Sequence, residues 1–278
     1  MALPKQAPLF LALLAAAAAQ PALAQSSDDW TGGYVGGFVG QVMDPDDGAD
    51  RFLFDTNLDG RFGDTVTTAA GADAFSPGSC NGVARGPTPG AGCEGNNGGA
   101  DWGIRGGYDW QFGNWVVGVV GEYGMNDARD AVSSFSTTPA RYTMLRKVDG
   151  VAAIRARVGA AFGANGENLV YATGGYARAK IENTFFTSNG INTFTDNGDG
   201  NASGAQLGIG YERRIGAFAV GVEYIRTQLS DDEYRVRAQG PAPATNPFIR
   251  QNPNGTDFRR SDDDFDLDSV RLTATYRF

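Results

Sequence analysis

The sequence has 278 residues, of which 40 are glycine and none is histidine, and its formal net charge is −9. Without histidine the chain has no Ser-His-Asp triad and no histidine-ligated zinc site. It carries 32 Asp plus Glu against 23 Lys plus Arg, and this acidic balance argues against binding to a phosphate backbone. We therefore expect no nucleic acid among its partners.

The first 24 residues have the pattern of a secretory signal peptide. Lys5 precedes an apolar run over 9–19, which is too short to span a bilayer as a helix. Ala22 and Ala24 then supply small residues at the cleavage site; a buried N-terminal helix is the alternative. We expect cleavage after Ala24, a mature chain over 25–278, and an oxidising compartment for its cysteines.

Eight segments of the mature chain alternate apolar and polar residues with a period of two, as β-strands do. In 101–112, Trp102, Ile104 and Tyr108 lie on one face, and Asp101 and Arg105 lie on the other. The alternation is weakest in the first segment, 30–42, because its glycines leave positions on its faces without a side chain. The segments are 30–42, 101–112, 115–123, 148–162, 169–182, 205–213, 218–224 and 270–278.

The links between these segments alternate strictly between long and short. Three are short (113–114, 163–168 and 214–217), and four are long (about 44–100, 124–147, 183–202 and 231–265). Outer-membrane barrels have short periplasmic turns, long extracellular loops and aromatic residues near the strand ends. The sequence therefore predicts an all-β fold, an eight-stranded antiparallel transmembrane up-and-down β-barrel with long extracellular loops.

A soluble β-sandwich or lipocalin-like barrel is the alternative, with its apolar faces turned inward. A soluble core must be filled to close packing, whereas the apolar faces here mix small residues with Val, Leu and aromatics. Lipid tolerates small outward residues. Together with the signal peptide and the terminal Tyr276-Arg277-Phe278, the pattern favours the membrane barrel.

The polar faces of the strands predict a charged lumen. The interior of an eight-stranded barrel is just wide enough for side chains to fill it, and an unpaired buried charge is very costly. We expect a solid core of paired charges, with a gated ion path as the alternative. The predicted lumen residues are Arg105, Glu122, Arg155, Arg157, Arg178, Lys180, Glu182, Glu212, Glu223, Arg271 and Arg277.

The first long loop contains both cysteines of the chain, Cys80 and Cys93. A redox centre of the Cys-x-x-Cys type needs closer spacing. A disulfide that closes a loop of this length stabilises the fold by roughly 3 kcal/mol on the loop-entropy estimate. We therefore expect a structural disulfide, and two free thiols are the alternative.

The same loop carries Asp55-Thr56-Asn57-Leu58-Asp59-Gly60, which matches the start of an EF-hand calcium loop. Asp55, Asn57 and Asp59 can offer converging oxygens, and Asp64 is a fourth candidate ligand. Position 12 of the motif is Val66 rather than the bidentate glutamate. A calcium site is one interpretation, and a solvated loop rich in Asx-turns is the other.

Two motifs at the ends of the mature chain resemble a known family. Residues 30–37, Trp-Thr-Gly-Gly-Tyr-Val-Gly-Gly, resemble the opening strand of small outer-membrane β-barrel proteins of alphaproteobacteria, the porin-like family akin to the OmpA and OmpX barrels. Residues 269–278 resemble that family's closing strand. The resemblance implies that Tyr276 and Phe278 belong to the signal read by the barrel-assembly machinery, and it supplies no catalytic set.

Three functions are open for such a protein. A structural, surface-exposed role in the cell envelope leads. A porin-like channel for small solutes or ions, and adhesion or ligand recognition through the acidic loops, are the alternatives. An enzyme is not expected, because outer-membrane proteases and lipases commonly use histidine. We expect a monomer in the outer membrane whose partners are lipid, lipopolysaccharide and the assembly machinery, with no cofactor except calcium in the first loop.

Overall fold

The computed structural model describes residues 29–44, 50–231 and 234–278, so the predicted signal peptide and its cleavage site lie outside the described residues. These residues form β-strands together with one short 3-10 helix, η1 (Pro89–Ala91). They include no helix that is long and apolar enough to cross a membrane. The architecture of the described chain therefore depends on how its strands pair.

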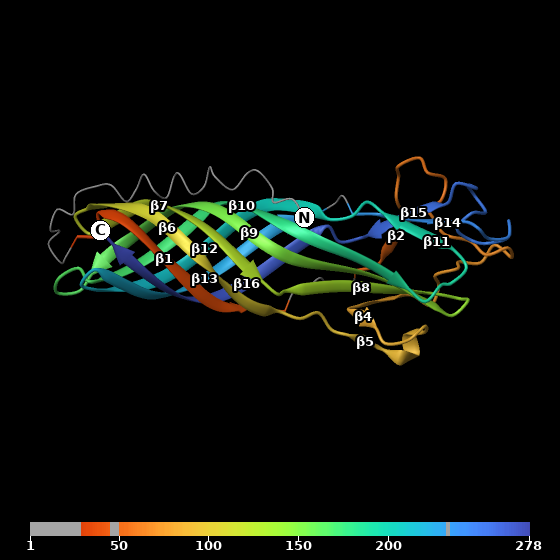
Figure 1. The fold of residues 1–278 in the computed structure, drawn as a ribbon, viewed down its shortest axis with the longest axis horizontal. Helices are drawn as coiled ribbons and strands as arrows, with labels where there is room; N and C mark the ends of the chain where they lie inside the picture. Colours follow the sequence, from red (N-terminus) through yellow and green to blue (C-terminus); the bar gives the residue numbers. More distant parts are fainter. Residues whose placement is uncertain (1–28, 45–49, 232–233) are drawn as a thin grey trace, which may run out of the picture.

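Eight antiparallel strands in the described part of the chain close into a barrel (Figure 1). Each strand pairs with the next one along the chain, and the last pairs with the first, so that Tyr34 lies opposite Arg277. The predicted eight-stranded up-and-down barrel is confirmed. Its strands are β1 (Gly32–Val42), β6 (Gly99–Phe112), β7 (Trp115–Asn126), β9 (Ala140–Phe162), β10 (Asn168–Thr187), β12 (Gly200–Ile215), β13 (Phe218–Ser230) and β16 (Asp264–Arg277).

Three short connections lie at one end of the barrel, which we call the turn end. The two-residue links β6–β7 and β12–β13 contain Gly113 and Gly216, whose φ angles are +62° and +63°. These values lie in the left-handed region that glycine adopts without steric cost. The β9–β10 link occupies 163–167, between the two strands. Each short link predicted from the sequence therefore corresponds to a turn between neighbouring barrel strands.

At the opposite end the four long connections fold into a compact structure, which we call the cap (residues 50–98, 127–147, 183–199 and 234–263). Figure 1 shows it extending the barrel along its long axis. Strands β2 (Phe52–Asp55), β11 (Thr193–Asp196), β14 (Val236–Gln239) and β15 (Thr256–Arg260) form a separate sheet in the order β11–β14–β15–β2. All four long connections contribute to the cap, so the long segments predicted as loops contain strands of their own.

Other short strands extend the barrel wall into the cap. β8 (Arg129–Ser136) pairs with the start of β9, and β3 (Ser79–Asn81) pairs with β8. β4 (Val83–Ala84) and β5 (Cys93–Glu94) form a small hairpin beside them. Most of the predicted loop 124–147 is therefore strand, because β9 continues well beyond the barrel.

The cap has an apolar core rich in aromatic rings. The Phe54 and Phe75 ring centroids are 4.5 Å apart, and those of Phe52 and Phe258 are 5.3 Å apart. Phe75, in turn, packs on Tyr142 at 5.1 Å. These side chains come from connections that are far apart in the sequence, so the core joins the separate loops into one folded unit.

The outer surface of the barrel is apolar and has two bands of aromatic side chains. Between the bands the outward residues are mainly aliphatic, such as Ile104, Ile154 and Leu272, and they are exposed. The band toward the cap contains Trp102, Tyr123, Tyr176 and Tyr224. The band toward the turn end contains Trp110, Phe112, Trp115, Phe162, Tyr211, Phe218 and Tyr276.

A bulge changes which residues of β9 face inward. The register with β10 shifts where Gly150 pairs with Lys180 and Val148 pairs with Ile181, so that Asp149 is the extra residue. From Val151 to Ala161 the buried residues of β9 are the odd-numbered ones, and from Ala140 to Val148 every even-numbered residue is buried, with Thr143 buried as well. The bulge therefore turns Asp149 outward and Arg146 inward.

Candidate functional site

The centre of the barrel is filled by five acidic and five arginine side chains, so their formal charges cancel. All ten are at most 8% exposed. They come from six of the eight strands, because neutral residues such as Tyr34 of β1 and Thr173 of β10 occupy the inward positions of the other two. We call this set the central network: Asp101, Asp109, Glu122, Glu212, Glu223, Arg105, Arg155, Arg157, Arg271 and Arg277.

Toward the turn end, Asp109 and Glu212 hold two arginines of the central network. Arg277 Nη2 donates to Asp109 Oδ2 at 2.9 Å, and Arg157 Nη1 lies 3.5 Å from the same oxygen. Arg157 Nη2 donates to Glu212 Oε2 at 2.8 Å. Arg157 thus bridges two carboxylates, which brings β6, β9, β12 and β16 together.

Toward the cap, Glu122 and Glu223 hold the other three arginines. Arg155 Nη2 donates to Glu122 Oε2 at 2.6 Å, and Arg271 Nη1 donates to the other oxygen of Glu122 at 2.7 Å. Arg271 Nε also donates to Asp101 Oδ2 at 2.6 Å. Arg105 Nη1 donates to Glu223 Oε2 at 3.2 Å. Each carboxylate in this group is paired, as buried charges require.

Aromatic rings inside the lumen contact the same guanidinium groups. Arg157 lies 3.8 Å from the ring centroid of Tyr171, and Arg271 lies 4.3 Å from that of Phe38. An arginine above an aromatic face gains a cation–π interaction, which is stronger when both groups are desolvated. The rings therefore fill space between the charges and also stabilise them.

An apolar layer closes the lumen at the turn end. Its largest member, Trp30, is fully buried, and its indole Nε1 donates to the carbonyl of Gly166 at 2.8 Å. Arg277 Nη2 donates to the carbonyl of Trp30 at 2.5 Å. The lower layer consists of Trp30, Val116, Ala161, Leu169, Tyr171 and Ala219.

A second apolar layer lies between the central network and the cap. Small residues on the middle strands, such as Ala153 and Ala179, make room for larger ones, such as Leu229 and Phe265. The lumen is thus filled by an apolar layer, a charged network and a second apolar layer in succession. The upper layer consists of Val42, Ala128, Val148, Val151, Ala153, Ala177, Ala179, Ile181, Ala202, Leu229, Phe265 and Leu267.

A family model described as an outer membrane protein beta-barrel domain matches residues 9–278 of the sequence. The chain belongs to this family. The match fits the closed ring, the apolar outer surface and the two aromatic bands, which correspond to the two membrane interfaces. The family points to the outer membrane as the location. No curated protein matches the chain.

Solved structures with a similar fold have little sequence in common with this chain. The outer membrane protein OprG from Pseudomonas aeruginosa is 13% identical, with a TM-score of 0.48, over 91% of this chain and 99% of that one. Ail, the attachment invasion locus protein of Yersinia pestis, is 10% identical, with a TM-score of 0.33, over 89% and 99%. The outer membrane protease OmpT from Escherichia coli is 7% identical, with a TM-score of 0.38, over 89% and 97%.

Eight of the eleven residues predicted for the lumen lie in the central network, and three do not. The prediction is wrong for Arg178, Lys180 and Glu182, which are exposed on the outside of β10. They follow Tyr176 of the aromatic band toward the cap, so they lie beyond the apolar surface. Lys180 pairs there with Asp149 at 3.0 Å. Outside the membrane a charged face turns to water, and the rule that the charged face lines the lumen no longer applies.

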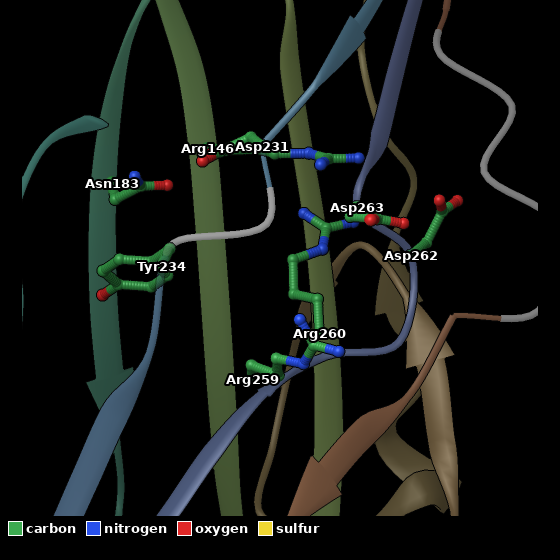
Figure 2. A pocket seen from close by; sticks show the side chains of 8 residues that line it. All are labelled: Arg146, Asn183, Asp231, Tyr234, Arg259, Arg260, Asp262 and Asp263. Atoms are coloured by element: carbon green, nitrogen blue, oxygen red, sulfur yellow. The ribbon is translucent and has the colours of Figure 1, made fainter. Parts of the chain in front are cut away.

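A second cluster of charges joins the barrel to the cap. Arg146 Nε donates to Asp130 Oδ2 at 2.5 Å, and Arg260 Nη2 lies 2.7 Å from the same oxygen. Arg260 also pairs with Asp50 at 2.8 Å. Figure 2 shows Arg146 and Arg260 reaching toward the segment that carries Asp262 and Asp263.

The hollow in Figure 2 is too small for a metabolite. Its volume is about 10 Å³, which corresponds to about one water molecule. Asp262, on its rim, has a pKa above its ordinary value because burial disfavours its charged form. The cluster is therefore suited to hold the barrel and the cap together, and it was not predicted because its charged residues come from three separate long connections.

The residues predicted to bind calcium form a tight turn. Asp55 accepts hydrogen bonds from the backbone N–H groups of Asp59 and Gly60, at 3.2 and 2.8 Å. Asn57 also accepts from Asp59 N at 2.9 Å, and Asp64 accepts from Thr56 N at 2.9 Å. In the described part of the chain, no group of three Asp, Glu, His or Cys side chains could hold a metal ion. Calcium binding here stays a prediction.

Cys80 and Cys93 form the predicted disulfide. Cys80 lies in β3 and Cys93 in β5, so the bond fastens the β4–β5 hairpin to the strand that extends the barrel wall. The first loop is thereby linked to β8 through β3. The bond stabilises the side of the cap and takes no part in the central network.

Proposed function

We propose that this protein is a closed outer-membrane anchor that displays a folded extracellular cap and conducts no steady ion current. One observation carries the proposal: the ten charges of the central network are buried and paired between two apolar layers. An ion that enters the lumen must break these pairs and also cross both apolar layers. Eight-stranded barrels have this filled type of interior.

A folded cap supports a surface-exposed structural role. The four long connections are longer than is needed to join one barrel strand to the next. The apolar core of the cap and its own sheet give these connections a fixed shape. Adhesion or ligand recognition is the second candidate, and an uncharged hollow in the cap favours it. A porin-like channel is the third, and the filled lumen argues against it.

The remaining features of the proposal concern location and assembly. We propose that the chain reaches the outer membrane after cleavage near Ala24-Gln25, as a monomer in contact with lipid and lipopolysaccharide, and that it belongs to the alphaproteobacterial branch of such barrels. Tyr276 faces outward, and Phe278 packs against Gly33; we assign both to the signal for the barrel-assembly machinery. We propose no catalytic role, which a panel of protease and lipid-hydrolysis assays tests.

Conductance in planar lipid bilayers tests the closed lumen. The wild-type protein is expected to give no steady current. The double variant Arg157→Ser/Glu212→Ser removes a cation and an anion together, so it leaves the net charge unchanged while it empties the middle of the lumen. It is expected to show intermittent openings. Steady openings of porin size in the wild type would overturn the proposal.

A further inference from the structure

The cap contains a hollow with a volume of about 220 Å³, and all of its lining residues lie in the cap, including Ala140 and Tyr142 at the start of β9. Its walls are the β8–β9 turn at 136–140, the segment 188–192 after β10, and residues 246–248, together with Ala74 and Phe75. The end of β8 and the start of β9 lie at the end of the molecule opposite the short turns (Figure 1). A ligand in this hollow would therefore be held away from the membrane.

Three aromatic rings form the floor of the hollow. Phe75, Tyr142 and Phe248 lie with ring centroids 5.1 to 5.8 Å apart. Tyr142 and Phe248 are buried by the cap core behind them, so their rings are fixed in place. The planes of these rings are inclined to one another by 55° to 65°, so the floor is a rigid, concave apolar surface against which the apolar face of a ring-shaped ligand can pack.

Asparagine side chains fix one wall of the hollow. Asn192 Nδ2 donates to Gln239 O at 3.1 Å, and Asn246 Nδ2 donates to Asn192 Oδ1 at 3.1 Å. Asn189 Oδ1 accepts from the backbone N–H groups of Ile191 and Asn192, at 2.8 and 3.2 Å. The wall is therefore organised before a ligand arrives, which lowers the entropic cost of binding.

The hydroxyl group of Tyr142 connects the aromatic floor to the asparagine wall through a hydrogen bond. Asn189 Nδ2 donates to the Tyr142 hydroxyl at 2.9 Å, and the hydroxyl of Ser136 is a second hydrogen-bonding partner of the same group. Burial raises the pKa of Tyr142, which keeps the group a protonated donor at neutral pH. Hydroxyl groups of the β8–β9 turn and of Ser188 lie around the same opening.

The lining of the hollow is uncharged. None of the described residues that form it is Asp, Glu, Lys or Arg, although charged residues make up 20% of the chain. An ionic ligand would lose its hydration there without gaining a partner. A wholly apolar ligand would cover the hydroxyl and amide groups without bonding to them, which is also unfavourable.

We propose that this hollow binds the pyranose ring of a neutral sugar. Such a ring has an apolar face for the aromatic floor and hydroxyl groups for the rim. The volume is below the roughly 300–1,000 Å³ of pockets for drug-sized ligands, so it suits a single ring. The proposal rests on the cap being displayed outside the cell, and it deepens the proposed function by naming what the cap recognises.

Saturation-transfer NMR on the purified mature protein, in a detergent without a sugar headgroup, tests the assignment. The probes are glucose, galactose, mannose and N-acetylglucosamine, with glucuronate, glucosamine and toluene for comparison. We expect saturable binding of at least one neutral sugar and binding of both charged sugars that is at least tenfold weaker. Absence of binding by all four neutral sugars, equal binding of a charged sugar, or preference for toluene would overturn the proposal.

Two pairs of variants locate the binding. Tyr142→Phe removes only the hydroxyl, and the affinity for the sugar is expected to fall about three- to tenfold. Tyr234→Phe is its control, because it makes the same change at a buried tyrosine outside the hollow. Gly190→Trp blocks the rim, since a Cβ there meets no atom within 4 Å, and binding should be lost. Gly90→Trp is its control at a position that is equally open.

These outcomes test the sugar-binding proposal independently of the proposal that the lumen is closed. Binding that survives Gly190→Trp, or that falls equally in Tyr234→Phe, would overturn the site even if a sugar binds. Protection of the cap from protease in each variant shows whether it is folded. Steady conductance of the wild type would refute the closed anchor while leaving sugar binding intact, and failure to bind sugar would leave the conductance result unchanged.

Discussion

The barrel and the cap are stabilised by opposite kinds of interior. The middle of the barrel is held by paired charges such as Arg155 and Glu122, whereas the cap is held by rings such as Phe54 and Phe258. Lipid surrounds the barrel, so its apolar side chains face outward and polar ones are left for the inside. Water surrounds the cap, so the arrangement is reversed there.

One strand shows where the reversal occurs. Within the barrel, β9 turns Arg155 and Arg157 inward and Ile154 and Val158 outward. Beyond the bulge at Asp149 the same strand turns Tyr142 and Met144 into the cap core. The comparison teaches that the solvent around each section of a strand decides which of its two faces is buried.

The largest expected effect comes from leaving charges unpaired in the barrel. Glu122→Ala removes the carboxylate shared by Arg155 and Arg271. Breaking a buried pair from one side costs about 3–5 kcal/mol, so we expect destabilisation of about 4 kcal/mol. Urea unfolding in lipid vesicles, followed by tryptophan fluorescence, measures this change.

Lys180→Ala is the matched control, because it breaks the exposed ion pair with Asp149 on the outside of β10. Exposed pairs contribute little, so its unfolding curve should coincide with that of the wild type. If Glu122→Ala unfolded at the same urea concentration as this control, the barrel interior would not depend on its charge pairs.

The second prediction concerns the aromatic core. Phe258→Ala removes a ring that contacts Phe52, Phe54 and Phe248. A buried Phe→Ala change costs about 3–5 kcal/mol, and we expect the lower value because loops relax more easily than a barrel. The cap should become sensitive to protease on intact cells, while the barrel still resists SDS until it is boiled.

Phe112→Ala serves as the control for that variant, because its ring is exposed on the outside of the barrel near the turn end. It should leave the cap protected. Loss of SDS resistance in Phe258→Ala would mean that the two interiors unfold together rather than separately, and the comparison between them would no longer hold.

The smallest expected effect is a pH-dependent change in stability at the boundary between the barrel and the cap. Burial raises the pKa of Asp262 above its ordinary value, so the folded cap binds this proton more tightly than the unfolded chain does. That contribution to stability is complete below the ordinary pKa and is lost as pH rises through the raised one. Asp262→Asn should therefore stabilise the cap slightly at neutral pH, by less than about 1 kcal/mol.

Near-ultraviolet circular dichroism of the cap during urea unfolding, at several pH values between about 3 and 7, tests this. The variant should show a smaller decline in stability than the wild type as pH rises. A decline that is equal in the two proteins would show that Asp262 does not contribute to the pH dependence.

Much of the barrel could be predicted from the sequence because period-2 alternation is local. Trp115, Val117 and Val119 lie on one face of a strand whether or not the rest of the fold is known, and the two-residue link 113–114 fixes the register with 101–112. The same alternation correctly placed Arg105, Glu122 and Glu223 inside, and it contained Asp101 and Asp109 as well, although these two were not selected.

The cap could not be predicted in the same way. The strands of its separate sheet, β2, β11, β14 and β15, are only four or five residues long and come from three separate connections, so Phe54, Phe194 and Phe258 show no periodic pattern along the chain. Their proximity depends on barrel closure. Arg178 was misplaced for a related reason, since its sequence neighbourhood does not show where the apolar surface of the barrel ends.

Trp30 links closure of the barrel wall to closure of the lumen. Its backbone carbonyl is bound by Arg277 of β16, and its indole is bound by the β9–β10 turn. The contact with Arg277 requires β16 to be in place, so a barrel that lacks its final strand also lacks this part of the seal at its turn end. The strand that closes the wall therefore also completes the seal of the lumen.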